Sequence, residues 1–368
     1  MAKVSYSSVF GALTLNTQAR IDAASRLQKQ IFDKAVYEDY LDWDTPSIGL
    51  NFEEILGKYN ISIAAATIGD NSKEPVIGEA GVSTYANKVL KHAISRALTS
   101  AEYRKVLAIQ DSKSLSDTEV KQQLIDIMWG GVNDVVNGVK AKIDMIFLGA
   151  LSNEGQFTFD ETNNPEGGVK GLINYNMPSG NIATADTPWT EANIGTVDPF
   201  EDLCDLMAAA DDKVEIGSFL IAPSKLNYLL RSPKMRAAVF GTDKSAAPLT
   251  LQALNQFMES NSLPTFTKIR RKVNVKSGNT ITSVTPWNAK NIVAVPKGKI
   301  GTIKNAYADN ELRNEPGVTY SNYGRIRVSQ WGVGEVQGTN GVEYTKAESL
   351  SLPVLTEVEG IFTLKTEN

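Results

Sequence analysis

Histidine and cysteine are almost absent from this 368-residue chain, which has one of each, His92 and Cys204. A single cysteine excludes disulfide bonds within the chain, so synthesis in the cytoplasm is expected. One histidine cannot build the common zinc sites, and no nucleophile motif accompanies it to form a catalytic dyad or triad. We therefore predict a structural role for His92 and a buried, unreactive thiol on a helix for Cys204.

Long apolar runs and a strong net charge are also missing. No stretch reaches the roughly 18 consecutive apolar residues of a transmembrane helix, so no membrane span is expected. The N-terminal sequence MAKVSYSSVFGALTLNTQAR has neither the apolar core nor the cleavage site of a secretory signal. The hydrophobic content of 42% and the charged content of 21% are typical of globular chains. A net charge of −5 provides no large basic field for tight nucleic-acid binding.

Motifs of catalysis and cofactor binding are absent as well. The glycines of Gly332-Val333-Gly334 and Gly338 imitate a dinucleotide loop, but the third is one place late and no helix is expected to follow. No glycine-rich segment ends in the Gly-Lys-Ser or Gly-Lys-Thr of a phosphate loop. Acid pairs such as Asp211-Asp212 are common on solvated surfaces. We predict no catalytic, cofactor or metal site; a monomeric hydrolase with an unrecognised carboxylate site is the alternative.

What the chain does contain is one long periodic segment. From Ser116 to Leu151 apolar residues recur every three or four positions, which predicts a single helix with one apolar face. Ser116 and Glu119 form a capping box at its start. Two shorter helices broken at Gly130-Gly131 are the alternative, because each glycine weakens a helix by about 1 kcal/mol. The predicted apolar face comprises Val120, Leu124, Ile127, Val135, Val139, Ile143, Ile146 and Ala150.

The segments before this helix look extended and lack a core of their own. Residues 1–58 carry scattered apolar side chains and an irregular stretch from Leu41 to Tyr59, so they need a surface on this chain or on a neighbour. Alternating apolar residues in the segments 61–65 and 82–94 then predict a two-stranded ribbon. A two-stranded hairpin alone is marginally stable, so the ribbon must lie on its own domain or reach another subunit. We expect its outgoing strand and the following turn to present a solvated charged face, formed by Lys88, Lys91, His92, Arg96, Arg104 and Lys105.

The second half of the chain alternates helices and strands. A strand at 156–159 and a turn at 164–167 follow the long helix, in a connection that is expected to form a hairpin or contact partners. Asp198 caps a helix with proline at its first position, and the buried strand 217–223 comes next. A basic strand, TFTKIRRKVNV, and an apolar strand, NIVAVP, complete a separate α/β or α+β unit. The last forty or so residues are strand-like and are expected to return to an earlier domain's sheet.

The order of these pieces resembles the major capsid proteins of tailed bacteriophages, and among them the lambda-type capsid protein E family. The local likenesses lie in GALSNEGQFTFDE, the segment 189–200, SFLIAPSKLNYLLRSPKMRAAVFG, NIVAVPKGKIGT and SLPVLTEVEGIFTL. Each is diffuse, but their order covers nearly the whole chain. Encapsulin shells share the fold and are the alternative within this class.

The resemblance implies an α+β capsid fold in four parts. These are an N-terminal arm (1–58), an extended β-ribbon loop (59–105), a peripheral domain with the long helix (106–194 and 321–368), and an α/β axial domain (195–320). The implied function is a structural, non-enzymatic subunit that self-assembles into hexamers and pentamers of an icosahedral phage head enclosing double-stranded DNA, in a virion assembled in the bacterial cytoplasm. The implied partners are other copies, a separate scaffolding protein, a portal, a decoration protein and packaged DNA.

Two sets of candidate contact residues follow from this resemblance. Contacts between subunits are expected from the arm and the ribbon, at Phe10, Leu13, Ile63, Ile68, Pro75, Val76 and Ile77. Contacts to DNA phosphates, without sequence reading, are expected from Arg26, Lys29, Arg270, Arg271 and Lys272.

Overall fold

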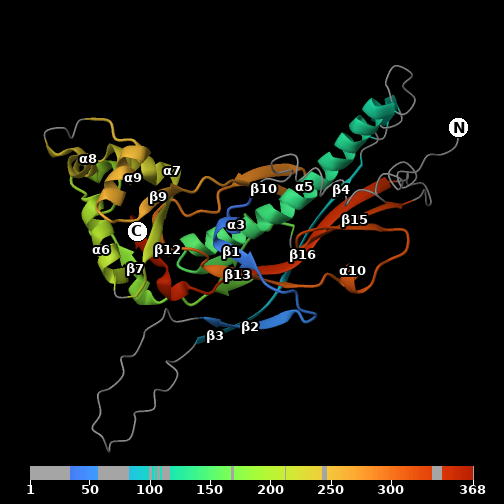
Figure 1. Cartoon of the computed structure of the whole chain (residues 1–368), viewed down its shortest axis with the longest axis horizontal. Helices are drawn as coiled ribbons and strands as arrows, with labels where there is room; N and C mark the ends of the chain where they lie inside the picture. The colour runs from blue at the N-terminus through green and yellow to red at the C-terminus, as the bar shows by residue number, and fades with distance from the viewer. Residues whose placement is uncertain are drawn as a thin grey trace, which may run out of the picture.

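The computed structural model of the chain describes residues 34–56, 83–98, 102, 104–105, 108–109, 117–166, 170–211, 213–242, 247–333 and 342–367. Its longest element is the helix α5 (Asp117–Ser152), which runs through the centre and projects beyond the body at one end (Figure 1). The predicted helix 116–151 is thus confirmed to within one residue, and it is continuous through Gly130-Gly131. Ser116, and with it the predicted capping box, lies outside the described residues.

The apolar face of α5 is confirmed where its side chains are described. Val135, Val139, Ile143, Ile146 and Ala150 are all buried. The last turns differ from the expected amphipathic pattern, because every residue from 143 to 152 is buried. Along its length α5 packs against β5, β10 and β12 as well as β4 and β16, and the apolar residues of its last turns lie in the core, so this end has no face left for solvent.

A large sheet lies along α5, which packs mainly against two of its strands, β16 and β4. The sheet has the order β1-β13-β16-β15-β14, and β4 also pairs with β16. Its centre is the 14-residue strand β16, whose first half lies between β15 and β4 and whose second half pairs with β13. The bounds are β1 (Leu41–Trp43), β4 (Leu90–Ala97), β13 (Gly301–Ala306), β14 (Thr319–Tyr323), β15 (Ile326–Val333) and β16 (Val342–Leu355).

A second, five-stranded sheet forms the other end of the molecule, with four helices gathered on it (Figure 1). The helix α6 begins at Pro199 next to Asp198, as predicted, and its proline needs no hydrogen-bond acceptor at that position. The helices are α6 (Pro199–Asp211), α7 (Pro223–Arg231), α8 (Pro233–Phe240) and α9 (Leu251–Ser260). The sheet order is β7-β17-β12-β8-β9, with β7 (Ile182–Thr184), β8 (Ile216–Ile221), β9 (Thr265–Lys268), β12 (Asn291–Pro296) and β17 (Phe362–Lys365).

Two hydrophobic cores follow these two sheets, and they divide the chain differently from the predicted domain boundaries. Ile300 and Ile303, expected in the axial domain, are buried in the core around α5. Phe362 and Leu364, expected in the peripheral domain, belong instead to the core of the helical end. The chain end does return to an earlier sheet, because β17 pairs with β12 and β7.

Three two-stranded hairpins complete the described structure. The hairpin of β5 (Gln156–Phe159) and β6 (Gly171–Asn174) confirms both the predicted strand and the predicted hairpin after α5. The predicted basic strand is interrupted, because β9 ends at Lys268 and β10 (Val273–Ser277) turns back with β11 (Thr280–Val284). The third hairpin joins β2 (Asn51–Leu56) to β3 (Ser83–Lys88). Short helices lie at α3 (Tyr37–Tyr40), α10 (Asp309–Leu312), η1 (Ser179–Asn181), η2 (Glu191–Asn193) and η4 (Val358–Gly360).

The described part of the predicted N-terminal arm takes one of the two places left open by the sequence, a surface on its own chain. Residues 34–47 lie on the chain's own body, where Tyr37 and Leu41 are buried in the core around α5. The stretch expected to be irregular contains β1, which pairs in parallel with β13, and β2. The aromatic residues Tyr37, Tyr40 and Trp43 explain this placement, since each needs apolar surface and finds it on or beside α5.

Candidate assembly surfaces

The β2–β3 hairpin lies below the body in the view of Figure 1, with Phe52 packed against the core, and belongs to no larger sheet among the residues described. Its register runs from Asn51 opposite Lys88 to Leu56 opposite Ser83. The predicted ribbon is therefore present, but its incoming strand is 51–56; the segment 61–65 lies outside the described residues. Its outgoing strand is split at Val89, whose N–H donates to the Leu50 carbonyl oxygen at 2.9 Å. Beyond Val89 the chain enters the large sheet as β4.

The strand β4 anchors this ribbon through buried polar groups. The His92 ring is buried, and its Nε2 lies 3.0 Å from the Ser351 carbonyl oxygen. Burial, and next the nearby Lys142 ammonium, lower the pKa of His92 to about 4, so the ring is neutral near pH 7. A structural role for this histidine is confirmed, although its ring does not lie on a solvated face.

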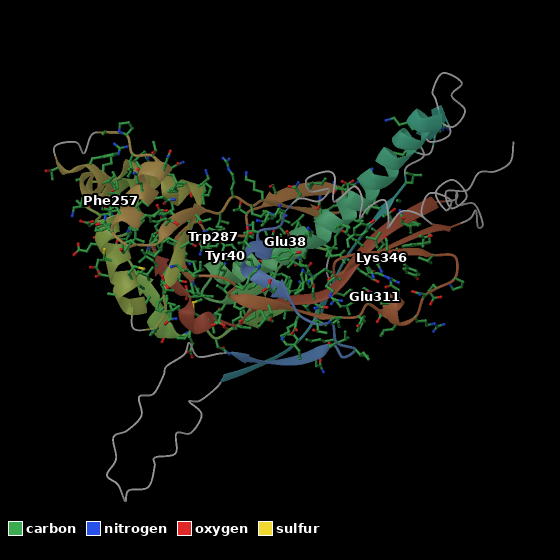
Figure 2. All side chains as sticks on the ribbon, in the orientation of Figure 1. Glu38, Tyr40, Phe257, Trp287, Glu311 and Lys346 are labelled. Carbon is green, nitrogen blue, oxygen red and sulfur yellow. The ribbon has the colours of Figure 1, made fainter. Side chains whose placement is uncertain are left out.

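A charged cluster fastens β4 to β16 from the other side of the strand. The Glu348 side chain is 2% exposed, and its Oε2 lies 3.2 Å from Lys91 Nζ and 2.5 Å from Lys346 Nζ. Burial raises the pKa of Glu348, but the two ammonium groups outweigh it and hold the pKa below its usual value. Figure 2 labels Lys346 on this part of the sheet, far from the helical end. Lys91 is therefore engaged within the chain and is not simply solvated.

Contacts with α5 fix the direction of β4. A Cβ atom at Gly138 would lie 3.2 Å from two carbon atoms of Ile94, so the missing side chain lets the strand approach the helix. The Arg96 guanidinium binds Asp134 on α5 and Glu102 in the following segment. The ribbon thus continues from a strand that is held on the long helix.

An exposed apolar surface lies where the ribbon leaves the body. Ser47 and Ala306 form a parallel bridge, and the Tyr307 N–H donates to the Ser47 carbonyl oxygen at 3.0 Å, which joins two distant segments. Ile48 is 76% exposed and Leu312, at the end of α10, is 57% exposed. Seven large apolar side chains of the described residues are exposed, and four of them lie on the two segments that this bridge joins, which is why we treat these four as one surface. We call it the stem patch: Ile48, Leu50, Tyr307 and Leu312.

A buried carboxylate ties the N-terminal segment to the body. Asp144 on α5 has no exposed surface, and its Oδ1 accepts a hydrogen bond from the Tyr37 N–H at 2.9 Å. Its Oδ2 lies 2.8 Å from Arg271 Nε, in an ion pair. Burial raises the pKa of Asp144, against the opposing effects of Tyr37 and Arg271. One turn earlier on α5, Lys140 Nζ lies 2.7 Å from Glu38 Oε1, and Figure 2 shows Glu38 and Tyr40 near the C-terminal part of α5.

The candidate contact residues fall into two groups. Of the five basic candidates, only Arg270, Arg271 and Lys272 are described: Arg270 and Lys272 are exposed, whereas Arg271 is engaged by Asp144 inside the molecule. The other candidates lie outside the described residues, namely Phe10, Leu13, Arg26, Lys29, Ile63, Ile68, Pro75, Val76 and Ile77. Sequence reasoning missed the stem patch, because its two halves are about 260 positions apart and only the bridge between Ser47 and Ala306 unites them.

Metal clusters, membrane-spanning helices and the single cysteine can each be checked in the described residues. In the ranges that the structure covers, no group of three or more histidine, cysteine, aspartate or glutamate side chains could hold a metal ion. In those same ranges, no helix has the length and apolar character to cross a bilayer. Cys204 lies half-buried in α6 as a free thiol, and burial, followed by Asp205, raises its pKa. The predicted position on a helix is confirmed and the predicted full burial is not, while a raised pKa makes a thiol less reactive.

Known structures share this architecture. A prophage protein from Escherichia coli CFT073, assigned as a capsid protein, is 12% identical and has a TM-score of 0.56, with 94% of this chain and 98% of that chain covered. A phage-related protein from Bordetella bronchiseptica RB50 is 10% identical with a TM-score of 0.50, covering 95% and 96% of the two chains. No curated protein sequence matches. At these identities the likeness establishes the fold alone, and that fold is the α+β fold of phage capsid subunits.

The sequence assigns the chain more narrowly. Residues 62–366 match the profile of the phage major capsid protein E family, and the chain belongs to this family. The family resemblance that the sequence suggested is thereby confirmed. The protein has a structural role as a capsid subunit, its copies assemble into an oligomeric shell, and its location is the virion.

Proposed function

We propose that copies of this chain form hexamers and pentamers that close into an icosahedral phage head around double-stranded DNA. The single observation that carries the proposal is the β2–β3 ribbon with the stem patch at its base, because this apolar surface has no cover among the described residues of its own chain. Water contact with such a surface is unfavourable, and a neighbouring copy removes it. The role is structural, without a catalytic step.

The strength of the shell comes from repetition. A contact that buries less than about 1,200 Å² is transient by itself. Each subunit of a closed shell makes several such contacts at once, and each one raises the effective concentration of the others. We propose that the segment 1–33, with Phe10 and Leu13, and the loop 57–82, with Ile63, Ile68, Pro75, Val76 and Ile77, supply further contacts of this kind.

The proposal includes partners that act with the shell. Assembly takes place in the bacterial cytoplasm on a separate scaffolding protein, a portal occupies one vertex, and a decoration protein binds outside. Basic side chains, with Arg26 and Lys29 as candidates, contact the packaged DNA through its phosphates. In this scheme the α5 and large-sheet core is peripheral in each ring, and the helical end is axial.

Electron microscopy tests the proposal directly. The chain is expressed alone and together with its scaffolding protein, and negatively stained particles are counted. Closed shells, or free hexamers and pentamers, are the expected result; a monomer that persists at high concentration would contradict it.

A second variant tests the ribbon. Residues Asn71–Ala80 are replaced by a short glycine-serine link, which leaves β2 and β3 intact. We expect shells to be lost while circular dichroism and the thermal midpoint stay those of the unaltered subunit. Normal shells from this variant would show that the loop has no bridging role.

A further inference from the structure

Four exposed basic side chains form a row at the junction of the two cores. They occupy alternate positions from 268 to 276, except position 274, which is an asparagine. We call Lys268, Arg270, Lys272 and Lys276 the basic row; all four are exposed. The residues between them point inward: Ile269 and Val273 are buried, and Arg271 pairs with Asp144. Alternation of this kind places successive exposed side chains on one side of an extended chain. Over eight residues the row spans roughly 26 Å.

The basic row has no acidic partner within the described residues, and this distinguishes it from other surface cations. Arg231, for example, binds Glu191, and Lys297 binds Glu215. Among the residues that the structure covers, no ion pair involves any of the four side chains of the row. Within the described part of the chain, no opposite charge offsets the repulsion between the neighbouring ammonium and guanidinium groups of the row.

The opposite charge lies on the helix α6. Glu201 and Asp205 are exposed, are four residues apart on one helix face, and have no basic partner among the described residues. Like charges at this spacing destabilise a helix by about 0.2–0.5 kcal/mol. The surrounding sequence sharpens the contrast: residues 186–215 contain nine acidic residues and one lysine, whereas residues 217–296 contain eleven basic and two acidic residues.

The two charged surfaces lie on different sides of the molecule. In Figure 1, α6 lies at the left of the helical end, while β9 lies below α7 and α9 on the side nearer the middle, and β10 lies further toward the middle. One subunit therefore does not bring its own α6 onto its basic row, but a neighbour in a ring can. Glu201 and Asp205 are about 6 Å apart along the helix axis, so the two carboxylates can face neighbouring side chains of the row. Surfaces of unlike charge on two sides of one chain are what a head-to-tail, ring-forming contact requires.

We propose that the basic row of one subunit binds the acidic face of α6, with Glu201 and Asp205, in a second copy of this chain. The inference rests on the proposed shell function and specifies one contact of that shell. DNA would neutralise the basic row but would leave the α6 carboxylates unpaired, whereas a second copy neutralises both surfaces. The contact sets which neighbours meet and how quickly, because unlike surfaces steer association.

A charge-exchange experiment tests the contact in the full chain. The row variant carries Lys268→Glu, Arg270→Glu and Lys272→Glu, and the helix variant carries Glu201→Lys and Asp205→Lys. We expect each variant alone to lower the yield of shells at least about tenfold while it remains folded, and the combined variant to regain most of that yield. Shells of the unaltered chain should also form more slowly as salt is raised, since screening weakens exposed charge pairs.

Controls separate this contact from general charge effects and from the shell function itself. Lys170→Glu with Arg313→Glu changes two exposed cations elsewhere, which are 72% and 86% exposed, and should assemble normally. If a charge-reversed variant is unfolded, the corresponding glutamine variants replace it, and a smaller loss of shells is expected.

Normal shells from the row variant, or no recovery in the folded combined variant, would overturn the inference. The inference would also be overturned if the row variant formed normal shells that failed only to retain double-stranded DNA, because the basic row would then be a DNA contact. Absence of shells from the unaltered chain would overturn the proposed function as well.

Discussion

Arg271 places its Nε 2.8 Å from Oδ2 of Asp144, a carboxylate with no exposed surface, while the neighbouring Arg270 and Lys272 are exposed. Adjacent basic residues thus have opposite roles. Alternation along an extended chain turns the middle one inward, where a buried anion requires a partner. This ion pair joins α5 to the connection between β9 and β10, and Tyr37 adds the N-terminal segment.

Loss of this ion pair should be costly. We expect Arg271→Ala to lower the free energy of unfolding by roughly 3 kcal/mol, because it leaves the buried Asp144 without its counter-charge. Arg270→Ala and Lys272→Ala are matched controls and should each change it by less than about 0.5 kcal/mol. Urea unfolding of the dilute, unassembled subunit measures all three. Equal effects at 270, 271 and 272 would contradict the structural role of Arg271.

The lone histidine should make stability depend on pH. His92 has a pKa near 4 in the folded chain, against 6.5 for the free side chain, so the unfolded chain binds more protons between these values. The contribution of the neutral His92 ring to the free energy of unfolding is therefore fully present above about pH 6.5. It is lost as the pH drops toward 4, and the loss from pH 6.5 to 5 is about 2 kcal/mol. Urea midpoints across this range, compared between the unaltered chain and His92→Gln, isolate the contribution. The difference between the two proteins should shrink at low pH; a constant difference would rule out this titration.

Two glycines of α5 should respond in opposite directions to alanine. A Cβ atom at Gly131 would have Thr345 Oγ1 as its nearest neighbour, at 3.9 Å, so Gly131→Ala should stabilise the helix by up to about 1 kcal/mol. At Gly149 a Cβ atom would lie 2.5 Å from Cδ2 of the buried Phe157 ring. Gly149→Ala should therefore lower stability by about 1–3 kcal/mol through overpacking. Thermal midpoints of the two variants test this pair, and a destabilised Gly131→Ala would point to a different packing of α5 on β16.

The stem patch should matter for assembly and not for folding. Ile48 is 76% exposed, so Ile48→Asp should leave the thermal midpoint of the subunit nearly unchanged. In a shell the same carboxylate would be forced into an apolar contact, and we expect particle yield to fall by at least about tenfold. Leu172→Asp, at a 56% exposed position of β6, is the matched control and should assemble. Sedimentation of fresh lysates separates shells from free subunits for both variants.

The elements with strong local patterns were predictable from the sequence. The three- and four-residue spacing of apolar side chains gave α5 within one residue, the Asp198-Pro199 start gave α6, and the short apolar runs gave β8 and β12. Local patterns did not predict the short strands that form only because they pair with distant parts of the chain. The segment 41–59 looked irregular because its strands are short, yet Leu41–Trp43 pairs with β13, and Asn51–Leu56 pairs with β3.

Amino-acid order alone indicated the class of this protein through one resemblance, the succession of motifs that is similar to phage major capsid proteins; the single cysteine and single histidine only argued against disulfides and the common catalytic sites. Only the tertiary structure decided which surfaces are free. The stem patch unites residues about 260 positions apart, and Arg271 is separated from Arg270 and Lys272 only by the burial of Asp144. The physical reason is that exposure depends on which distant segments cover a side chain, and no local periodicity records that.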